Sequence, residues 1–398
     1  MLRIIPRFIL ERPALALFSL LATASSGFGQ TYFVGVFGDS FRQQFGLTHS
    51  AYGLCYSAAT LCAAGLLIRF GPLVDRWQLG HVTMAAVLVL SAGCALLASA
   101  LSLPMFVVGL LLIRFGGQAM LSHIGISSAG RHFTAARGRA MALTAAGFPI
   151  TEAFLPALAV TILGSYGWRI PWFGSAVILI LILLPILLRL SRDAPDPRAV
   201  SPSRASQTPG KTRAEALRDL GFYWLMPATI AVPFTSTALL FHQSAIAQMN
   251  GWPPGLFAKA FIGFAAGHLL SLFGVGVVID RFGAQRVLPF TLVPMAVGLL
   301  LIGFAQAPAT PFLALALLGL SQGASNATVG AIWPERYGIE HIGAIRSVVQ
   351  AVMVVASAVS PILVGVLLDI DMSVELLMAV LALLAVGASL LAKCVAVR

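Results

Sequence analysis

The sequence predicts an all-α integral membrane protein with about twelve transmembrane helices. Of its 398 residues, 59% are hydrophobic and only 10% are charged, whereas soluble globular domains carry roughly 25% charged residues. The mean hydropathy is +0.92. Because one membrane span needs about 20 apolar residues, the length accommodates about twelve spans with short connections. A water-soluble fold is excluded.

Long apolar stretches, separated by polar residues, glycine and proline, place the predicted helices. In the first half they are 14–38, 50–73, 82–100, 104–128, 138–164 and 168–190. In the second half they are 221–249, 255–279, 287–305, 309–332, 342–368 and 373–395. These stretches are longer than the roughly ten-residue strands of an outer-membrane barrel and lack the strict alternation of apolar and polar residues that such strands show. Helices are therefore expected.

The basic residues predict the orientation in the membrane. If the N-terminus is cytoplasmic, 21 of the 25 Lys and Arg residues fall in or beside cytoplasmic segments, the exceptions being Arg42, Arg114, Arg169 and Lys259. This bias follows the positive-inside rule and predicts a bacterial inner (plasma) membrane protein with both termini cytoplasmic. Attraction to anionic lipid explains the net charge of +11, so no nucleic-acid partner is expected.

The chain divides into two similar halves. Residues 1–13 are expected to form a cytoplasmic or interfacial segment, and 191–218, rich in Pro, Ser and Arg, a cytoplasmic linker between six-helix bundles at 14–190 and 219–398. An offset of 205 residues aligns Gly71, Asp75, Arg76, Arg131, Gly138 and Pro156 with Gly276, Asp280, Arg281, Arg336, Gly343 and Pro361. Parallel repeats of this kind, with a substrate site at their interface, are a transporter architecture.

One motif occurs at matching loops of the two halves: GPLVDRWQLGH follows the second span and GVVIDRFGAQR follows the eighth. Both resemble the cytoplasmic signature of the major facilitator superfamily. The resemblance implies twelve helices in two pseudo-symmetric bundles and alternating access. It also implies a gating role for Gly71, Asp75, Arg76, Gly276, Asp280, Arg281 and Gly283.

The residue types of this motif suit a latch. A small residue at Gly71 would let neighbouring helices approach closely, and the Asp75 carboxylate could accept hydrogen bonds from a helix start. The alternative is that Asp75 and Arg76 only end a helix at the lipid headgroups.

Two further passages, SSGFGQTYFVGVF and PERYGIEHIGAIRS, resemble the monocarboxylate and oxalate/formate branch of that superfamily. In that branch, cationic residues in the eighth and eleventh spans commonly hold the substrate carboxylate. Here those spans offer His268 and Gln350 instead.

Two charged residues, Arg114 and Glu152, lie near the middle of predicted spans. Each costs about 2.5–3.5 kcal/mol on insertion scales, so a function is expected to justify it. They either form an ion pair or face one water-filled cavity. LLIRFGGQ around Arg114 resembles the R-x-x-Q-G motif of proton-coupled facilitators. We hypothesise that Glu152 carries the proton and that Arg114 binds an anion once Glu152 is protonated.

Other polar residues within spans are candidates for the substrate or proton pathway: Gln30, Tyr32, His242, Gln243, His268, Gln322, Asn326 and Gln350. Each could instead make an interhelical hydrogen bond. The resemblance implies that spans one, four, seven and ten line the cavity.

The sequence thus predicts a secondary active transporter of a small organic solute such as a monocarboxylate, coupled to protons. An exporter of amphiphilic or drug-like compounds is the alternative. A membrane-embedded enzyme or receptor is disfavoured, since no second catalytic acid, metal-ligand cluster or sizeable outer domain is present. No cofactor or metal is expected, and the protein is expected to be a monomer in the lipid bilayer.

Overall fold

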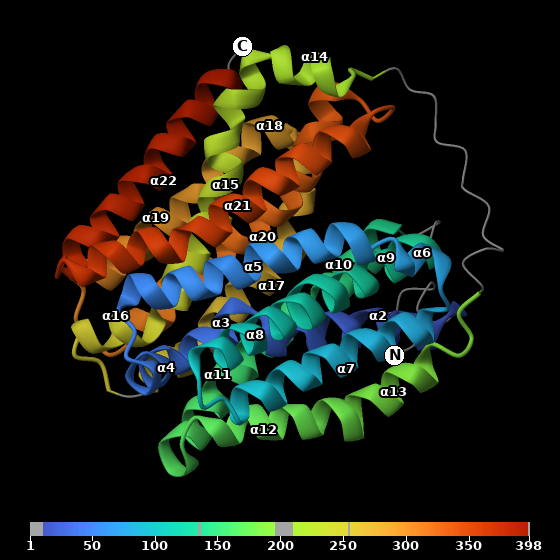
Figure 1. Ribbon diagram of the computed structural model, residues 1–398. Helices are drawn as coiled ribbons and strands as arrows, with labels where there is room; N and C mark the ends of the chain where they lie inside the picture. Colours follow the sequence, from blue (N-terminus) through green and yellow to red (C-terminus); the bar gives the residue numbers. More distant parts are fainter. Residues whose placement is uncertain (1–10, 134–136, 196–209, 254, 397–398) are drawn as a thin grey trace, which may run out of the picture. The chain divides into compact units, whose positions relative to one another are not determined.

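The computed structural model describes residues 11–133, 137–195, 210–253 and 255–396, and this part of the chain contains helices and no strands (Figure 1). Most of the predicted 1–13 segment and the middle of the predicted 191–218 linker lie outside these residues. Within them, eleven helices are long and apolar enough to cross a membrane. The predicted all-helical membrane protein is confirmed.

The first half of the chain contains the first six predicted spans. The first is the broken series α2 (Pro13–Ser25), η1 (Ser26–Gly29), α3 (Thr31–Val34), η2 (Gly35–Phe37) and α4 (Gly38–Phe45). The others are α5 (His49–Phe70) with α6 (Leu73–Arg76); α7 (Leu79–Ala98); α8 (Leu103–Ile113), η3 (Arg114–Leu121) and α9 (Ser122–His132); α10 (Arg137–Ala145) with α11 (Gly147–Tyr166); and α12 (Arg169–Ile178), η4 (Leu179–Leu183) and α13 (Leu184–Leu190).

The second half opens with a short helix, α14 (Arg213–Arg218), and continues with the other six spans. These are α15 (Leu220–Phe241), followed by the short α16 (Gln243–Met249); α17 (Leu256–Phe282); α18 (Ala284–Val287), η6 (Leu288–Leu292) and α19 (Val293–Phe304); α20 (Thr310–Tyr337); α21 (Ile342–Asp369); and α22 (Val374–Ala396). The predicted seventh span, 221–249, is thus two helices that meet at His242.

The helices form two compact units. The first consists of Met1–Gly46 and Cys55–Pro202, and the second of Leu47–Leu54 and Ser203–Arg398. In the first unit α2 packs against α9, α10 and α11, and α7 packs against α8 and α12. In the second, α17 packs along α20, while α15 contacts α21 and α22. The boundary inside α5 was not anticipated, because hydrophobicity does not reveal which unit a helix end joins.

Glycines permit a close contact between α17 and α20 in the second unit. A Cβ at Gly267 would overlap the Ala316 carbonyl oxygen, and one at Gly319 would overlap the Phe264 carbonyl oxygen. Small residues that let backbones approach are typical of helix pairs in membranes, where dispersion forces hold helices together.

The start of α5 is held inside the second unit by Asp369 at the end of α21. Its carboxylate accepts hydrogen bonds from the backbone N–H groups of His49 and Ser50, at 2.8 and 3.0 Å, and from the Ser50 hydroxyl at 2.5 Å. A carboxylate at a helix N-terminus satisfies donors that lack partners within the helix and complements its dipole. Gly53 adds close backbone packing, since a Cβ there would lie 2.6 Å from the Pro361 carbonyl oxygen.

Asp219 joins the start of α15 to the end of α20. As the N-cap of α15 it accepts a hydrogen bond from the Gly221 N–H at 3.0 Å. It also accepts from the Arg336 Nε at 3.0 Å and the Tyr337 hydroxyl at 2.9 Å. Burial alone would raise the pKa of Asp219, but these three donors and the positive charge of Arg336 outweigh it and hold the pKa below its usual value.

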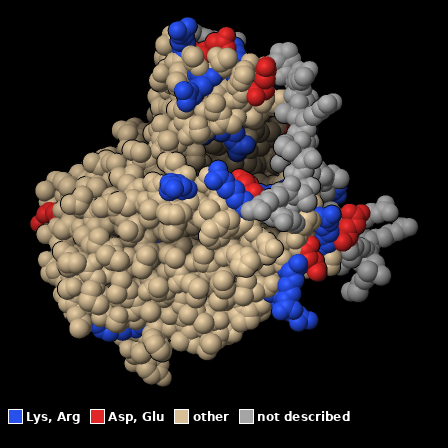
Figure 2. All heavy atoms as spheres, turned by 45° about the vertical axis from the view of Figure 1, so that its right-hand side comes forward, with Lys and Arg blue, Asp and Glu red and all other residues tan. Residues whose placement is uncertain are grey.

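Most atoms on the face shown in Figure 2 belong to uncharged residues. Large apolar side chains such as Ile68, Leu181, Leu270 and Leu383 are more than two-thirds exposed. In water such a surface would drive association. Against lipid tails it is stable, which agrees with the composition.

We expect the Asp219 contacts to stabilise the protein in a pH-dependent way. Because the folded-state pKa lies below the unfolded value of about 3.9, the stabilisation is fully present above that value and is lost as the pH falls through the folded pKa. Asp219→Asn should cost about 1–2 kcal/mol at pH 7, and this cost should shrink as the pH falls through the folded-state pKa of Asp219.

The measurement is thermal unfolding of the detergent-solubilised protein between pH 7 and pH 3. Asp280→Asn, which changes an exposed carboxylate in the same unit, serves as the matched control and should leave the unfolding temperature unchanged. A stability difference between wild type and Asp219→Asn that stays constant down to pH 3 would contradict this assignment.

Candidate functional site

The first span is interrupted near its middle. After α2 the chain tightens into the 3-10 turn Ser26–Gly29, and Gln30 is extended, with φ −84° and ψ 156°, before α3 begins. All four residues of the turn are buried. Interrupted helices leave backbone groups available inside the membrane, and such backbone is tolerated only within the protein or beside a cavity. The break thus marks a polar site in the first unit.

Glycines on two spans make this break possible. A Cβ at Gly29 would overlap the Ile113 carbonyl oxygen, and one at Gly117 would lie 2.9 Å from the Gly29 Cα. Gly117 belongs to Arg114–Leu121, where the fourth span is wound as a π-helix. π-helical turns inside α-helices occur frequently at functional sites. The irregular parts of the first and fourth spans therefore lie in direct backbone contact.

Arg114 begins the π-helical turn and is fully buried, with 0% exposure. Its Nη1 donates to the Gly29 carbonyl at 2.9 Å, and its Nε donates to the Thr60 Oγ1 at 3.0 Å. Its Nη2 is buried and has no hydrogen-bond partner among the residues that the structure describes. In the described part of the chain no carboxylate oxygen lies within 4.0 Å of the guanidinium.

Arg114 therefore does not form the ion pair with Glu152 that the sequence allowed. The helical rise predicts that both residues lie at a similar depth, but depth does not determine which neighbour a side chain meets. Among the described residues, the polar contacts of the buried Arg114 charge are with neutral groups.

Tyr56 and Thr60 form the wall beside Arg114. The guanidinium carbon lies 4.6 Å from the centre of the Tyr56 ring, and such cation–π contacts are worth about 2 kcal/mol when desolvated. The Tyr56 hydroxyl is 2.5 Å from the Thr31 Oγ1 in α3. Tyr56 and Thr60 escaped the sequence analysis, although their spacing of four places both on one face of a helix.

Glu152 lies on α11 with 6% exposure. The preceding residue, Thr151, places its Oγ1 2.7 Å from the Tyr32 hydroxyl, and the Glu152 carboxylate acts electrostatically on Tyr32. Gly27 leaves room for this contact, since a Cβ there would lie 2.7 Å from the Tyr32 oxygen. Tyr32 and Glu152 are thus brought together beside the broken helix, and the Gln30 amide nitrogen lies 3.4 Å from the Ser26 Oγ.

The remaining polar candidates belong to the second unit. His242 and Gln243 are buried where α15 meets α16: the His242 Nε2 lies 2.9 Å from the Pro361 carbonyl oxygen, and the Gln243 amide donates to the Leu240 carbonyl. His268 is buried against Phe264, with ring centroids 6.1 Å apart.

Three of the second-unit candidates are less enclosed. Gln322 donates to Asn326 at 3.3 Å within α20, and Gln350 is exposed on α21. The second unit contains no counterpart of Arg114 at the repeat position, which is Gly319.

The two copies of the gating motif differ in their contacts. In the first, Asp75 forms an ion pair with Arg131, which also donates to the Val74 carbonyl at 3.1 Å. In the second, Arg336, the repeat equivalent of Arg131, pairs with Asp219 at 2.9 Å rather than with the exposed Asp280. Arg281 lies over the Phe282 ring at 5.3 Å, while Arg76 is exposed at the end of α6.

The glycines of the two motif copies differ in their surroundings and in their backbone conformation. At Gly71 the nearest atom of another helix to an added Cβ would be the His123 Nε2 at 3.6 Å, and at Gly276 nothing lies within 4 Å. Among the described residues of its own unit, Gly71 thus makes an ordinary van der Waals contact, and its role in a latch stays a prediction. Gly283 has a backbone role, since its φ of +84° disfavours other residues. The Ala284 N–H beside it donates to Glu335 at 2.6 Å.

Comparison with known proteins identifies the family. The family model described as the Major Facilitator Superfamily matches residues 19–258 and 225–397. The fold is similar to that of a bacterial homologue of the human lysosomal transporter Spinster, crystallised in an inward-facing and unoccupied conformation. The TM-score is 0.65 at 16% identity, over 97% of this chain and 94% of that chain. The comparison with curated proteins finds no match.

This family consists of transporters, not enzymes, so the chain is a secondary transporter that carries a small-molecule substrate through the membrane. The closer resemblance to the monocarboxylate and oxalate/formate branch stays a prediction. The match over nearly the whole length confirms the fold that the paired loop motifs implied: the chain belongs to the major facilitator superfamily.

Proposed function

We propose that the chain carries a small organic anion together with a proton, and that the anion binds at Arg114. The observation that carries this proposal is the buried guanidinium with an unpartnered Nη2 and no carboxylate pair in the described part of the chain. A buried charge costs several kcal/mol unless it is paired. A substrate carboxylate would supply the missing partner through a charge-assisted hydrogen bond.

The coupling to protons would act through space rather than through a broken ion pair. Glu152 is buried beside Tyr32 on the same broken-helix site. When ionised, its negative charge opposes the entry of an anionic substrate into this low-dielectric region, and a proton removes that opposition. Substrate anion and proton then enter together as a neutral pair, which is the lowest-energy way to move a carboxylate through a membrane.

The proposal includes a location and an assembly state. We place the protein in a bacterial inner membrane with both termini cytoplasmic, as the distribution of its basic residues supports. A monomer suffices, since Arg114, Tyr56, Thr31 and Glu152 all come from one unit of one chain.

Arg114→Gln is expected to lower carboxylate uptake at least tenfold, because a lost charge-assisted hydrogen bond costs about 1.5–3 kcal/mol. The uptake by Arg114→Lys should lie between that of the wild type and that of Arg114→Gln, since Lys keeps the charge but lacks the planar fork that binds carboxylates. The measurement is uptake of lactate, oxalate and benzoate into proteoliposomes. Uptake of the neutral amides of these acids is measured in parallel.

Arg169→Gln is the matched control, because Arg169 lies at the end of a span, over the Trp168 ring at 4.3 Å. It should leave uptake unchanged. Equal uptake of acids and amides, with Arg114→Gln affecting both alike, would contradict the proposal and favour an exporter of amphiphilic compounds.

Glu152→Gln is expected to separate substrate movement from proton movement. Anion exchange across the membrane should persist, while solute-dependent acidification, followed with a pH-sensitive dye inside the vesicles, should disappear and the rate should no longer vary with pH. Glu375→Gln, at the exposed start of α22, is the control. Gradient-driven uptake with unchanged pH dependence in Glu152→Gln would exclude the coupling role.

A further inference from the structure

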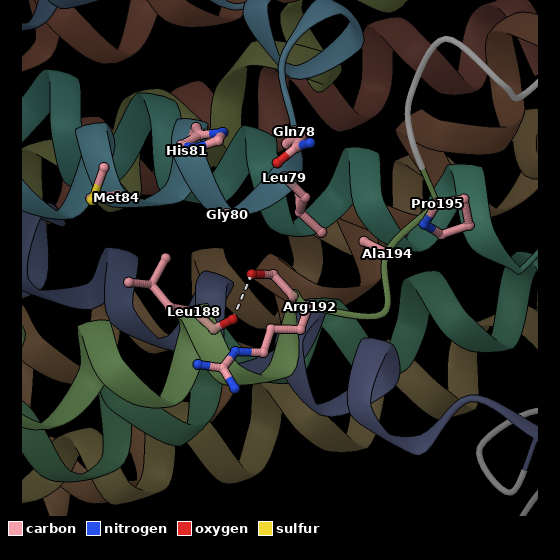
Figure 3. A pocket seen from close by; sticks show the side chains of 10 residues that line it. Gln78, Leu79, Gly80, His81, Met84, Leu188, Arg192, Ala194 and Pro195 are labelled. Atoms are coloured by element: carbon pink, nitrogen blue, oxygen red, sulfur yellow. Dashed lines mark hydrogen bonds between the residues drawn. The ribbon is translucent and has the colours of Figure 1, made fainter.

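Adjoining cavities lie at one end of the first unit, where α7 starts and α13 ends. The first, of about 440 Å³, lies between these two helix ends and is lined by Gln78, His81, Leu188 and Arg192 among others. In Figure 3 the residues at the start of α7 face those at the end of α13 across it. We refer to this cavity and the two that follow it along α7 and α6 as the rim groove.

The second cavity, of about 540 Å³, shares Gln78, His81 and Met84 with the first. The third, of about 340 Å³, shares Arg76 with the second and extends to Arg69 and Ile68. The rim groove is therefore continuous along the lining residues of all three cavities.

The lining of the rim groove is basic. It contains Arg69, Arg76, Arg192 and His81 but neither Asp nor Glu. Within the described residues none of these three arginines has an ion-pair partner, and Arg69 only lies over the Phe70 ring at 5.9 Å. Three guanidinium groups without carboxylates make the groove attractive to an anion.

The position of the rim groove at the ends of two candidate spans predicts that it lies at the depth of the lipid headgroups. The candidate spans Leu79–Ala98 and Arg169–Leu190 both end at the first cavity, and span ends lie at the boundary between hydrocarbon and headgroups. Trp77, in the second cavity, is 49% exposed, and tryptophans are enriched at this boundary. The bilayer therefore borders the groove and can supply its occupant.

The second cavity gives the groove an apolar extension. Met84, Ala85 and Leu88 line it along α7, and Met84 and Leu88 are 37% and 45% exposed. From Leu79 to Leu88 a helix rises about 14 Å, which is roughly half of the 30 Å hydrocarbon core and matches one leaflet. A free phosphate would leave this part unfilled, whereas an acyl chain would cover it.

Two features shape the headgroup end of the rim groove. The first turn of α7 has no side-chain cap, so backbone N–H groups there remain available to an acceptor. Gly80 lets the start of α7 lie close to the end of α13, because a Cβ at this position would lie 3.1 Å from the Ser191 Oγ. Ser191 itself donates to the Leu188 carbonyl at 3.0 Å.

We propose that the rim groove binds an anionic phospholipid of the inner leaflet. The phosphate would sit in the first cavity near Arg192, His81 and the start of α7, with Arg76 beside it, and one acyl chain would run along Met84 and Leu88. A zwitterionic lipid would fit the shape but would bring a second, positive group to a basic lining. This site is distinct from Arg114 and does not depend on which solute is transported.

The test is native mass spectrometry of the full-length detergent-solubilised protein, titrated with phosphatidylglycerol or with phosphatidylcholine of the same acyl chains. One phosphatidylglycerol should bind with a clear affinity advantage over phosphatidylcholine. Arg76→Gln/Arg192→Gln should weaken its binding roughly 30-fold, given about 1 kcal/mol per basic residue near the surface. Arg76→Lys/Arg192→Lys should retain most of the affinity, because it keeps both charges.

Arg139→Gln, which removes an exposed arginine of α10 outside the groove, should bind phosphatidylglycerol like the wild type. A final titration adds millimolar inorganic phosphate, which should not displace the lipid. Equal binding of the two lipids, equal weakening in Arg139→Gln and the Arg76/Arg192 double variant, or displacement by phosphate would each overturn the proposal.

Discussion

The structure of the first unit depends on one constraint: a guanidinium at Arg114 must be solvated in the middle of a membrane protein. The side chain is fully buried, and no carboxylate of the described residues pairs with it. The protein therefore offers neutral acceptors, which are the Gly29 carbonyl, the Thr60 hydroxyl and the Tyr56 ring. Each of these requires a particular local structure.

The Gly29 carbonyl is available only because the first span is interrupted there. The interruption needs the backbone of the first span to touch that of the fourth, and glycine at positions 29 and 117 permits it. The π-helical winding from Arg114 onward changes the direction of the side chains that follow. Broken helix, π-helical turn and buried charge thus form one arrangement. Within the described chain it leaves Nη2 without a partner, the property that an anion-binding site needs.

Hydrophobicity was sufficient to predict the spans, because each helix must present apolar side chains to lipid over a nearly fixed length. It could not predict the break at Ser26–Gln30, since glycine and serine are also tolerated in continuous transmembrane helices. The contacts of Arg114 could not be predicted from the sequence either. Sequence spacing gives the depth of a side chain in the membrane, whereas its neighbours depend on how helices rotate and pack.

The repeat shows the same limit. The offset of 205 residues correctly paired Arg131 with Arg336 as equivalent positions, but the first contacts Asp75 and the second contacts Asp219. Asp219 lies in the connection before α15, where the repeat offers no aligned motif residue. Aligned residues thus occupy similar places in the two units and form different networks.

The central claim is that Arg114 binds the anionic group of the transported solute. It is tested most directly by an experimental structure of the protein in lipid with a transported bromo-substituted carboxylate, whose bromine locates the molecule. We predict a carboxylate oxygen within hydrogen-bond distance of the Arg114 Nη2, with the contacts to Gly29 and Thr60 retained. A carboxylate bound elsewhere, with Nη2 still without a partner, would contradict the account.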